Sequence, residues 1–131
     1  MKCLFDNNLS IKLAKTLNFL EGEDGVHVVH LREKFLANTP DIEWITELGK
    51  EGGWFIITED RQIRNKPHEK IAWQESNLPV VFLNRGWASL NFWDIAWKII
   101  KCWPEVKKCV SYNINAKTFE LPVKGKIKVL D

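Results

Sequence analysis

The feature that most constrains the fold is a repeated switch between two hydrophobic periods along the chain. Short apolar runs, rich in β-branched residues, predict strands over residues 2–5, 25–31, 54–58 and 78–84, with a strand-like tail over residues 118–130. Apolar residues at every third or fourth position predict helices over residues 9–20, 39–51, 66–76 and 91–103. Strands that alternate with helices predict a layered α/β fold with a mainly parallel sheet.

Capping residues and apolar faces add detail to the first two long helices. Ser10 can accept from the free N–H groups of the first helix, and Thr39 followed by Pro40 predicts the start of the second. Gly52 and Gly53 predict its end. The faces expected to be buried consist of Leu13, Leu17 and Leu20 in the first helix, and of Ile42, Ile45 and Leu48 in the second.

Size and composition place the chain in an ordinary globular class. Its 131 residues predict a single domain over residues 1–131, with 45% hydrophobic and 27% charged residues. No uncharged apolar run of about 18 residues occurs, and an aspartate already stands at position 6, so we expect neither a membrane span nor a secretory signal. Three cysteines without a CxxC pair argue against disulfides and zinc, which favours a cytoplasmic protein.

Three aspartates stand where distant parts of the chain are expected to meet. Asp6 follows the first strand and Asp60 follows the third, and the carboxyl ends of parallel strands lie at one edge of a sheet. Asp41 is in the first turn of the helix before the third strand, where negative charge is stabilised. Glu43 lies about 200° around that helix from Asp41, so only one of them can point into the cluster, and we choose Asp41.

A cluster of carboxylates without His or Cys favours Mg²⁺ or Mn²⁺, which prefer oxygen ligands and take others from water and substrate phosphate. Such a cation can activate a water and stabilise a leaving oxyanion, as in metal-dependent phosphodiester hydrolysis. The alternative is structural: each aspartate taken singly can be a turn residue, a capping residue or a favourable helix-start charge.

Basic residues follow Asp60 closely. Arg61, Arg64 and Lys66 are candidates for contacts with substrate phosphate, because guanidinium and ammonium groups position a backbone without reading its bases. The alternative is a solvated surface, although Lys66 and Lys70 would repel each other on one helix face. The three histidines are expected at the surface: His27, His30 and His68.

Charge is distributed unevenly along the chain. Residues 1–60 contain 11 acidic and 6 basic residues, whereas residues 98–131 contain 8 lysines and 3 acidic residues. If these regions are neighbours in space, an acidic site flanked by basic surface suits a ligand that carries phosphate and also contacts a metal ion. Charge that serves solubility alone is the alternative.

The helix predicted over residues 91–103 is apolar around most of its circumference. Trp93 and Trp97 are i,i+4 neighbours on it. We expect most of its apolar residues in the core, with enough apolar surface remaining for a protein interface at Trp93 and Trp97, where another protein or a second copy of the chain binds. Base stacking on these rings is the less favoured use, since basic residues do not alternate with them in the sequence.

Three ordered motifs carry a resemblance to a known family. They are "FDNNLS" at residues 5–10, "TPDIEWITELGKEGGWFIITEDRQIR" at residues 39–64 and "VFLNRGW" at residues 81–87, the last followed by an aromatic helix. Together they resemble the PIN-like domain family related to VapC-type toxins of toxin–antitoxin systems, over about residues 2–128. The resemblance implies a three-layer α/β/α sandwich and a Mg²⁺-dependent endoribonuclease that is neutralised by an antitoxin.

The resemblance also assigns residues. It implies Asp6, Asp41 and Asp60 as catalytic metal ligands. Asn8, Glu43 and Glu59 are candidate supporting groups, although an Asn after a strand more often caps the next helix. Glu33 is the candidate for a fourth acid found in full PIN domains. Asn7 and Gln62 stand where related short sequences often have acids.

Three functions from different classes follow. The first is a metal-dependent ribonuclease, the toxin of a type II toxin–antitoxin pair, and the second is a PIN-like module that has lost activity and binds nucleic acid or protein. The third is a phosphoacceptor signalling domain. It is disfavoured because Asn7 and Asn8 replace the adjacent acidic pair that it needs after the first strand.

Overall fold

A computed structural model describes residues 1–131. The strands are β1 (Lys2–Phe5), β2 (His27–His30), β3 (Trp54–Thr58), β4 (Val80–Leu83), β5 (Thr118–Leu121) and β6 (Lys128–Val129). The α-helices are α1 (Ile11–Glu21), α2 (Leu31–Lys34), α3 (Asp41–Glu51), α4 (Lys70–Ser76) and α5 (Phe92–Tyr112). Two 3-10 helices complete the set, η1 (Pro67–Glu69) and η2 (Arg85–Ser89).

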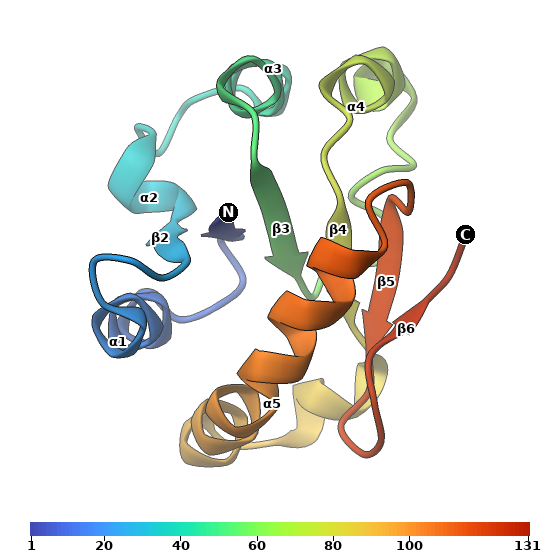
Figure 1. Cartoon of the computed structure of the whole chain (residues 1–131). Coiled ribbons are helices and arrows are strands. Elements are labelled where there is room, and N and C mark those ends of the chain that lie inside the picture. The colour runs from blue at the N-terminus through green and yellow to red at the C-terminus, as the bar shows by residue number, and fades with distance from the viewer.

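The strands form one sheet in the order β2-β1-β3-β4-β5-β6 (Figure 1). All pairs from β2 to β5 are parallel, and only β6 runs antiparallel to its neighbour β5. The mainly parallel α/β fold predicted from the alternating periods is therefore confirmed. Parallel order also brings the carboxyl ends of β1, β3, β4 and β5 to one edge of the sheet.

Two hydrophobic cores lie on opposite faces of the sheet, which makes three layers. Alternate residues of one strand enter different cores: Cys3 and Phe5 contact the core under α1 and α5, while Leu4 contacts the core under α3 and α4. In the second core the rings of Trp44 and Trp73 meet edge to face at 5.8 Å. The sandwich is thus covered by helices on both faces, as parallel sheets require.

The helix starts agree only in part with the capping pattern. Ser10 caps α1 as predicted, because its hydroxyl accepts from the N–H groups of Lys12 and Leu13. Thr39 does not cap α3: the N-cap position is Pro40, and no side chain caps this helix. Gly52, with φ of 74°, ends α3 as expected for a residue that tolerates positive φ.

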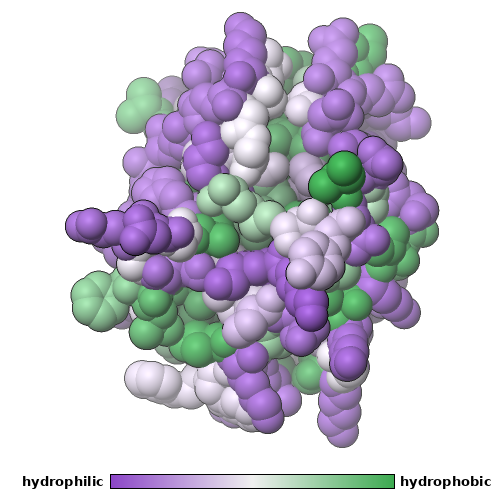
Figure 2. Space-filling model, in the orientation of Figure 1, coloured by the Kyte–Doolittle hydropathy of each residue, from purple (hydrophilic) through white to green (hydrophobic).

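Two residues expected in the core are exposed. Leu20 is 60% exposed, since it lies in the last turn of α1, past the buried Leu17. Ile42 is 45% exposed, and Trp44 takes its place in the buried face of α3. At about 100° per residue, Trp44 lies about 40° from the buried Leu48 on the helix circumference, whereas Ile42 lies about 120° from it. Figure 2 shows hydrophobic residues at the surface toward the lower left, where Figure 1 places α1.

The C-terminal third differs most from the predicted boundaries. The last helix continues past Trp103 to Tyr112, with Pro104 inside it. Pro104 is exposed, and Val106 and Val110 beyond it are buried against the sheet, which keeps the helix continuous despite the missing N–H.

Two further predicted segments differ in detail. The segment from Lys66 to Ser76 is divided into η1 and α4, and the tail forms the antiparallel pair β5–β6. None of the helices combines the length and the apolar character needed to cross a membrane.

Candidate active site

The three predicted aspartates line one cavity at the carboxyl edge of the sheet. Asp6 directly follows β1, Asp60 follows β3 by two positions, and Asp41 is the first residue of α3. The cavity has a volume of ≈ 230 Å³. Its lining residues are Asp6, Asn7, Asn8, Asp41, Trp44, Asp60, Ile63 and Lys66. The strand-end argument therefore correctly places these three side chains around one space.

Asp6 is the most buried of the three, with 9% of its surface exposed. Its Oδ2 accepts from the Thr58 hydroxyl at 2.7 Å, and its Oδ1 accepts from the Asn7 N–H at 2.8 Å. Burial raises the pKa of Asp6, and the negative charges of Asp60 and Asp41 raise it further, against the smaller lowering effect of the two hydrogen bonds. A buried carboxylate beside two others would gain most from a cation.

Thr58, the last residue of β3, organises the cavity. Its hydroxyl donates to Asp6 and accepts from the Asp60 N–H at 2.9 Å. The amide of Asn8 lies 3.5 Å from the same oxygen, and its Oδ1 accepts from the Glu59 N–H at 3.3 Å. The signal was present in the sequence, since a threonine two residues before an aspartate is the pattern of a side-chain turn.

Lys66 lies between the other two carboxylates. Its Nζ is 3.9 Å from Asp41 Oδ2 and 3.7 Å from Asp60 Oδ2. The second oxygen of each carboxylate has a neutral donor, the Trp44 indole N–H for Asp41 and the Gln62 N–H for Asp60. The chain thus supplies its own cation to Asp41 and Asp60, and no lysine or arginine pairs with Asp6.

Three acidic candidates lie outside the cavity lining. Glu43 is exposed on α3, on the side that the helix geometry predicted. Glu59 has a pKa raised by burial, but its side chain does not line the cavity. Glu33 accepts from the His30 N–H in the capping box of α2, so its carboxylate serves that helix start.

The prediction that His30 lies at the surface is wrong. It is buried, its Nε2 lies 2.8 Å from the Leu9 carbonyl oxygen, and its Nδ1 accepts from the Arg32 N–H. His30 thereby caps α2 and holds the loop after β1, a structural position that the periodicity of a short strand could not reveal. His68 is exposed and pairs with Glu69 at 3.0 Å.

The predicted phosphate contacts are not equally available. Arg64 donates through Nη1 to the carbonyl oxygens of Leu78 and Lys117, both at 3.1 Å, so it joins two backbone segments inside the fold. Arg61 is exposed and forms an ion pair with Glu120 at 3.2 Å. Sequence reasoning missed Arg32, whose Nε donates to Asn7 Oδ1 at 3.1 Å beside the cavity.

The donor chemistry fits a hard divalent cation. Three carboxylates and two side-chain amides line the cavity, without sulfur or imidazole, and these are ligands that suit Mg²⁺ or Mn²⁺. The side chains are not gathered around one point: no three His, Cys, Asp or Glu side chains are arranged to hold a metal ion together. A cation shared by Asp6, Asp41 and Asp60 therefore requires these side chains to move toward one another.

A sequence comparison decides the family. A family model described as a PIN like domain matches residues 1–85, nearly two thirds of the chain. The chain belongs to the PIN-like domain family. No curated protein and no solved structure is significantly similar to it. The PIN-like match includes Asp6, Asp41 and Asp60 and ends before α5, so the C-terminal third of this PIN-like domain is described by its own structure alone.

The last predicted site residues lie on that C-terminal third. Trp93 is 79% exposed and Trp97 is 48% exposed, so neither belongs to the core of the molecule. Both side chains project from the first half of α5, and Trp97 donates its indole N–H to Asp94 at 3.3 Å. Their exposure meets the requirement of a binding surface, which a fully buried aromatic helix would not.

Proposed function

We propose that this PIN-like domain is a Mg²⁺- or Mn²⁺-dependent endoribonuclease, with Asp6, Asp41 and Asp60 as metal ligands and catalytic residues. The observation that carries the proposal is their position around one cavity, with the pKa of Asp6 raised by burial and by the other two carboxylates. PIN-like domains have a nuclease-type fold, which supports phosphodiester hydrolysis as the reaction. RNA is the proposed substrate.

Each residue has a defined task in this proposal. When bound, the cation would activate a water for attack and stabilise the leaving oxyanion. Thr58 holds the Asp6 carboxylate in orientation through its 2.7 Å hydrogen bond, and Asn8 fixes the turn after β3. Lys66 moves from the two aspartates to a substrate phosphate, and Arg61 and Arg32 add positive charge beside the cavity.

The test is cleavage of a labelled RNA with Mg²⁺ or Mn²⁺ and with EDTA. Asp41→Asn should reduce the rate by at least about 100-fold, because the charge lost is one that the cation and the transition state require. Glu43→Gln is the matched control, since it removes an acid from the same helix outside the cavity, and it should cleave normally. Equal cleavage by both variants would contradict the assignment.

The second candidate is a catalytically weakened PIN-like module that binds nucleic acid or protein. It is favoured by Asn7 and Gln62, which supply no acid near the cavity, and by the absence of a ready-made group of three metal ligands. RNA binding without cleavage at any tested concentration of Mg²⁺ or Mn²⁺ would support this candidate over the nuclease.

The proposed biological role is that of a toxin neutralised by a cognate antitoxin. Trp93 and Trp97 are the proposed contact surface for that protein or for a second copy of the chain, because large exposed aromatic rings are frequent interface anchors. Co-expression with the product of an adjacent open reading frame tests it. A stable complex that suppresses cleavage and is weakened by Trp93→Ala is the expected result.

A further inference from the structure

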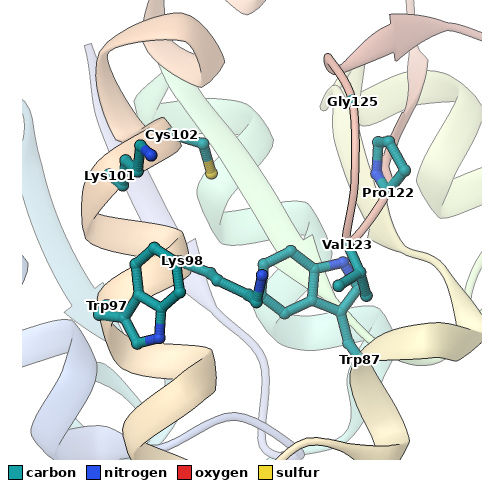
Figure 3. Close-up of a pocket in the computed structure, with 8 residues that line it drawn as sticks. All are labelled: Trp87, Trp97, Lys98, Lys101, Cys102, Pro122, Val123 and Gly125. Carbon is teal, nitrogen blue, oxygen red and sulfur yellow. The ribbon is translucent and has the colours of Figure 1, made fainter.

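A groove of ≈ 300 Å³ lies between α5, η2 and the turn that joins β5 to β6 (Figure 3). It is separate from the acidic cavity, and no residue lines both. Its lining residues are Trp87, Trp97, Lys98, Lys101, Cys102, Pro122, Val123 and Gly125.

One wall of the groove is fixed by the fold. Trp87 is buried, and its indole N–H donates to the Leu121 carbonyl oxygen at 2.9 Å. Gly86 allows η2 to approach the turn, since a Cβ at this position would lie 2.9 Å from a methyl carbon of Val123. The wall is therefore formed before any ligand binds, which lowers the entropic cost of binding.

The opposite wall carries an accessible aromatic ring with two cations beside it. The Nζ atoms of Lys98 and Lys101 lie 4.7 Å and 5.8 Å from the centroid of the Trp97 ring. Figure 3 shows the Lys98 side chain extending between the indoles of Trp97 and Trp87. The alternation of rings and basic groups that the linear sequence lacks is thus produced by the folded helix.

Charge in and around the groove favours an anion. No acidic residue lines it, and the exposed Lys124 and Lys126 flank Gly125 in the adjoining turn. Asp94, whose carboxylate accepts a hydrogen bond from the Trp97 indole N–H, does not line the groove. A ligand that offers a flat ring and negative charge together matches these features, and base stacking on an aromatic face is stronger than an exposed cation–π contact.

The groove and the acidic cavity share one edge of the sheet. Pro122 follows β5 and Trp87 follows β4, just as Asp60 follows β3. In Figure 1 the arrowheads of β3 and β5 point to the same edge of the sheet. Only β4 lies between these two strands, so β3 and β5 are two strand spacings, or about 10 Å, apart. The Arg61–Glu120 ion pair joins the segment after Asp60 to β5 along this edge.

We propose that the groove binds one nucleotide of a single-stranded RNA whose chain continues into the acidic cavity. The base stacks on Trp97, and Lys98 and Lys101 move from the ring to the adjacent phosphates. This inference rests on the proposed function, since it adds a substrate subsite to the same RNA path. All the residues that line the subsite lie outside the residues that match the family, so the family match does not describe it.

The test is fluorescence anisotropy with a labelled single-stranded RNA oligonucleotide in EDTA, which removes the divalent cation that cleavage requires. Trp97→Ala should weaken binding by about tenfold with an unchanged salt dependence, and Trp97→Phe should restore most of the affinity because it keeps an aromatic face. The double variant Lys98→Ala/Lys101→Ala should weaken binding and lower the salt slope by about one for each lost phosphate contact.

Matched controls come from the same helix. Tyr112 is an exposed aromatic residue at the C-terminal end of α5, and neither it nor the neighbouring Lys108 lines the groove, so Tyr112→Ala and Lys108→Ala should bind like the wild type. Thermal melts confirm that each variant is folded. Equal effects of Tyr112→Ala and Trp97→Ala, or no effect of either, would overturn the proposal, as would a Trp97→Ala variant that changes only the oligomeric state in sedimentation.

The two proposals can fail separately. Binding that depends on Trp97 in a protein that cleaves no RNA supports the subsite and removes the nuclease. Metal-dependent cleavage whose RNA affinity is indifferent to Trp97 and the two lysines supports the nuclease and removes the subsite.

Discussion

Two largely buried carboxylates in this molecule have opposite environments. Glu21, whose side chain is 7% exposed, accepts two hydrogen bonds from Lys107 Nζ, at 2.9 and 2.7 Å, and others from the Val26 N–H and the Trp103 indole. Burial alone acts to raise its pKa, but these donors together lower it. Glu21 thereby joins α1 to α5.

Asp6, with 9% of its surface exposed, has only two neutral donors, and its pKa is raised. Lys66, the basic residue that lines the cavity, pairs with Asp41 and Asp60 instead. The fold therefore satisfies the carboxylate that joins two helices and leaves the one beside the cavity without a cation. The difference separates a structural acid from one available for binding or catalysis.

The largest expected effect tests this comparison through activity. Asp6→Asn should abolish metal-dependent RNA cleavage, by at least about 100-fold, because it removes a carboxylate from the proposed cation site. Its unfolding free energy in EDTA should stay the same or rise, since a buried charge beside like charges is lost. Glu21→Gln should show the reverse, with normal cleavage and lower stability, and the same pattern in both variants would remove the distinction.

The contrast between these acids also shows which features could be predicted from the sequence and which could not. Strand and helix periods predicted most elements and, with the parallel-sheet rule, the convergence of Asp6, Asp41 and Asp60. The Glu21–Lys107 pair lies 86 positions apart in sequence and depends on where α5 crosses α1, which no local period encodes.

Other features could not be predicted from the sequence because they depend on side-chain geometry in the folded chain. The position of Lys66 between two aspartates depends on the irregular turn after β3, and the aromatic and basic groups of the groove alternate only once α5 is wound. The helix was predicted to end before Pro104, but it continues to Tyr112, because the tertiary packing of Val106 and Val110 outweighs the local cost of a proline.

The second prediction concerns stability alone. Glu21→Gln should lower the free energy of unfolding by about 1–3 kcal/mol, since hydrogen bonds from a charged donor are stronger than neutral ones and Lys107 loses its partner. Urea unfolding at neutral pH measures it. Glu23→Gln, an exposed acid just past α1, is the control and should change stability little. A Glu21→Gln variant as stable as the control would show that the pair contributes nothing net.

The third prediction uses pH. The pKa of Asp6 is raised above its ordinary 3.8, so the penalty of ionised Asp6 is full at neutral pH and disappears as pH falls through the raised value toward 3.8. The pKa of Glu21 is lowered from 4.5, so its stabilisation is full above 4.5 and is lost only as pH falls below that value. Unfolding in EDTA from neutral to acidic pH should therefore show the stability advantage of Asp6→Asn and the stability deficit of Glu21→Gln both shrinking, so that the two variants approach the wild type from opposite sides. A stability deficit of Asp6→Asn, or an advantage of Glu21→Gln, that shrinks in this way would contradict the assigned environments.

The smallest expected effect concerns Lys66. Because its ammonium group lies between Asp41 and Asp60, it should compete with a divalent cation for these two carboxylates. Its distances of 3.9 and 3.7 Å to Asp41 and Asp60 describe two partly exposed pairs, each worth about 0.2–1 kcal/mol. Lys66→Ala should therefore raise Mn²⁺ affinity by about two- to tenfold in titration calorimetry, with the gain shrinking as salt is added. Lys70→Ala removes the same charge from an exposed position outside the cavity and should leave the affinity near the wild-type value. Weaker Mn²⁺ binding by Lys66→Ala would show that the lysine supports the acidic side chains in their binding arrangement, and the role of competitor would be wrong.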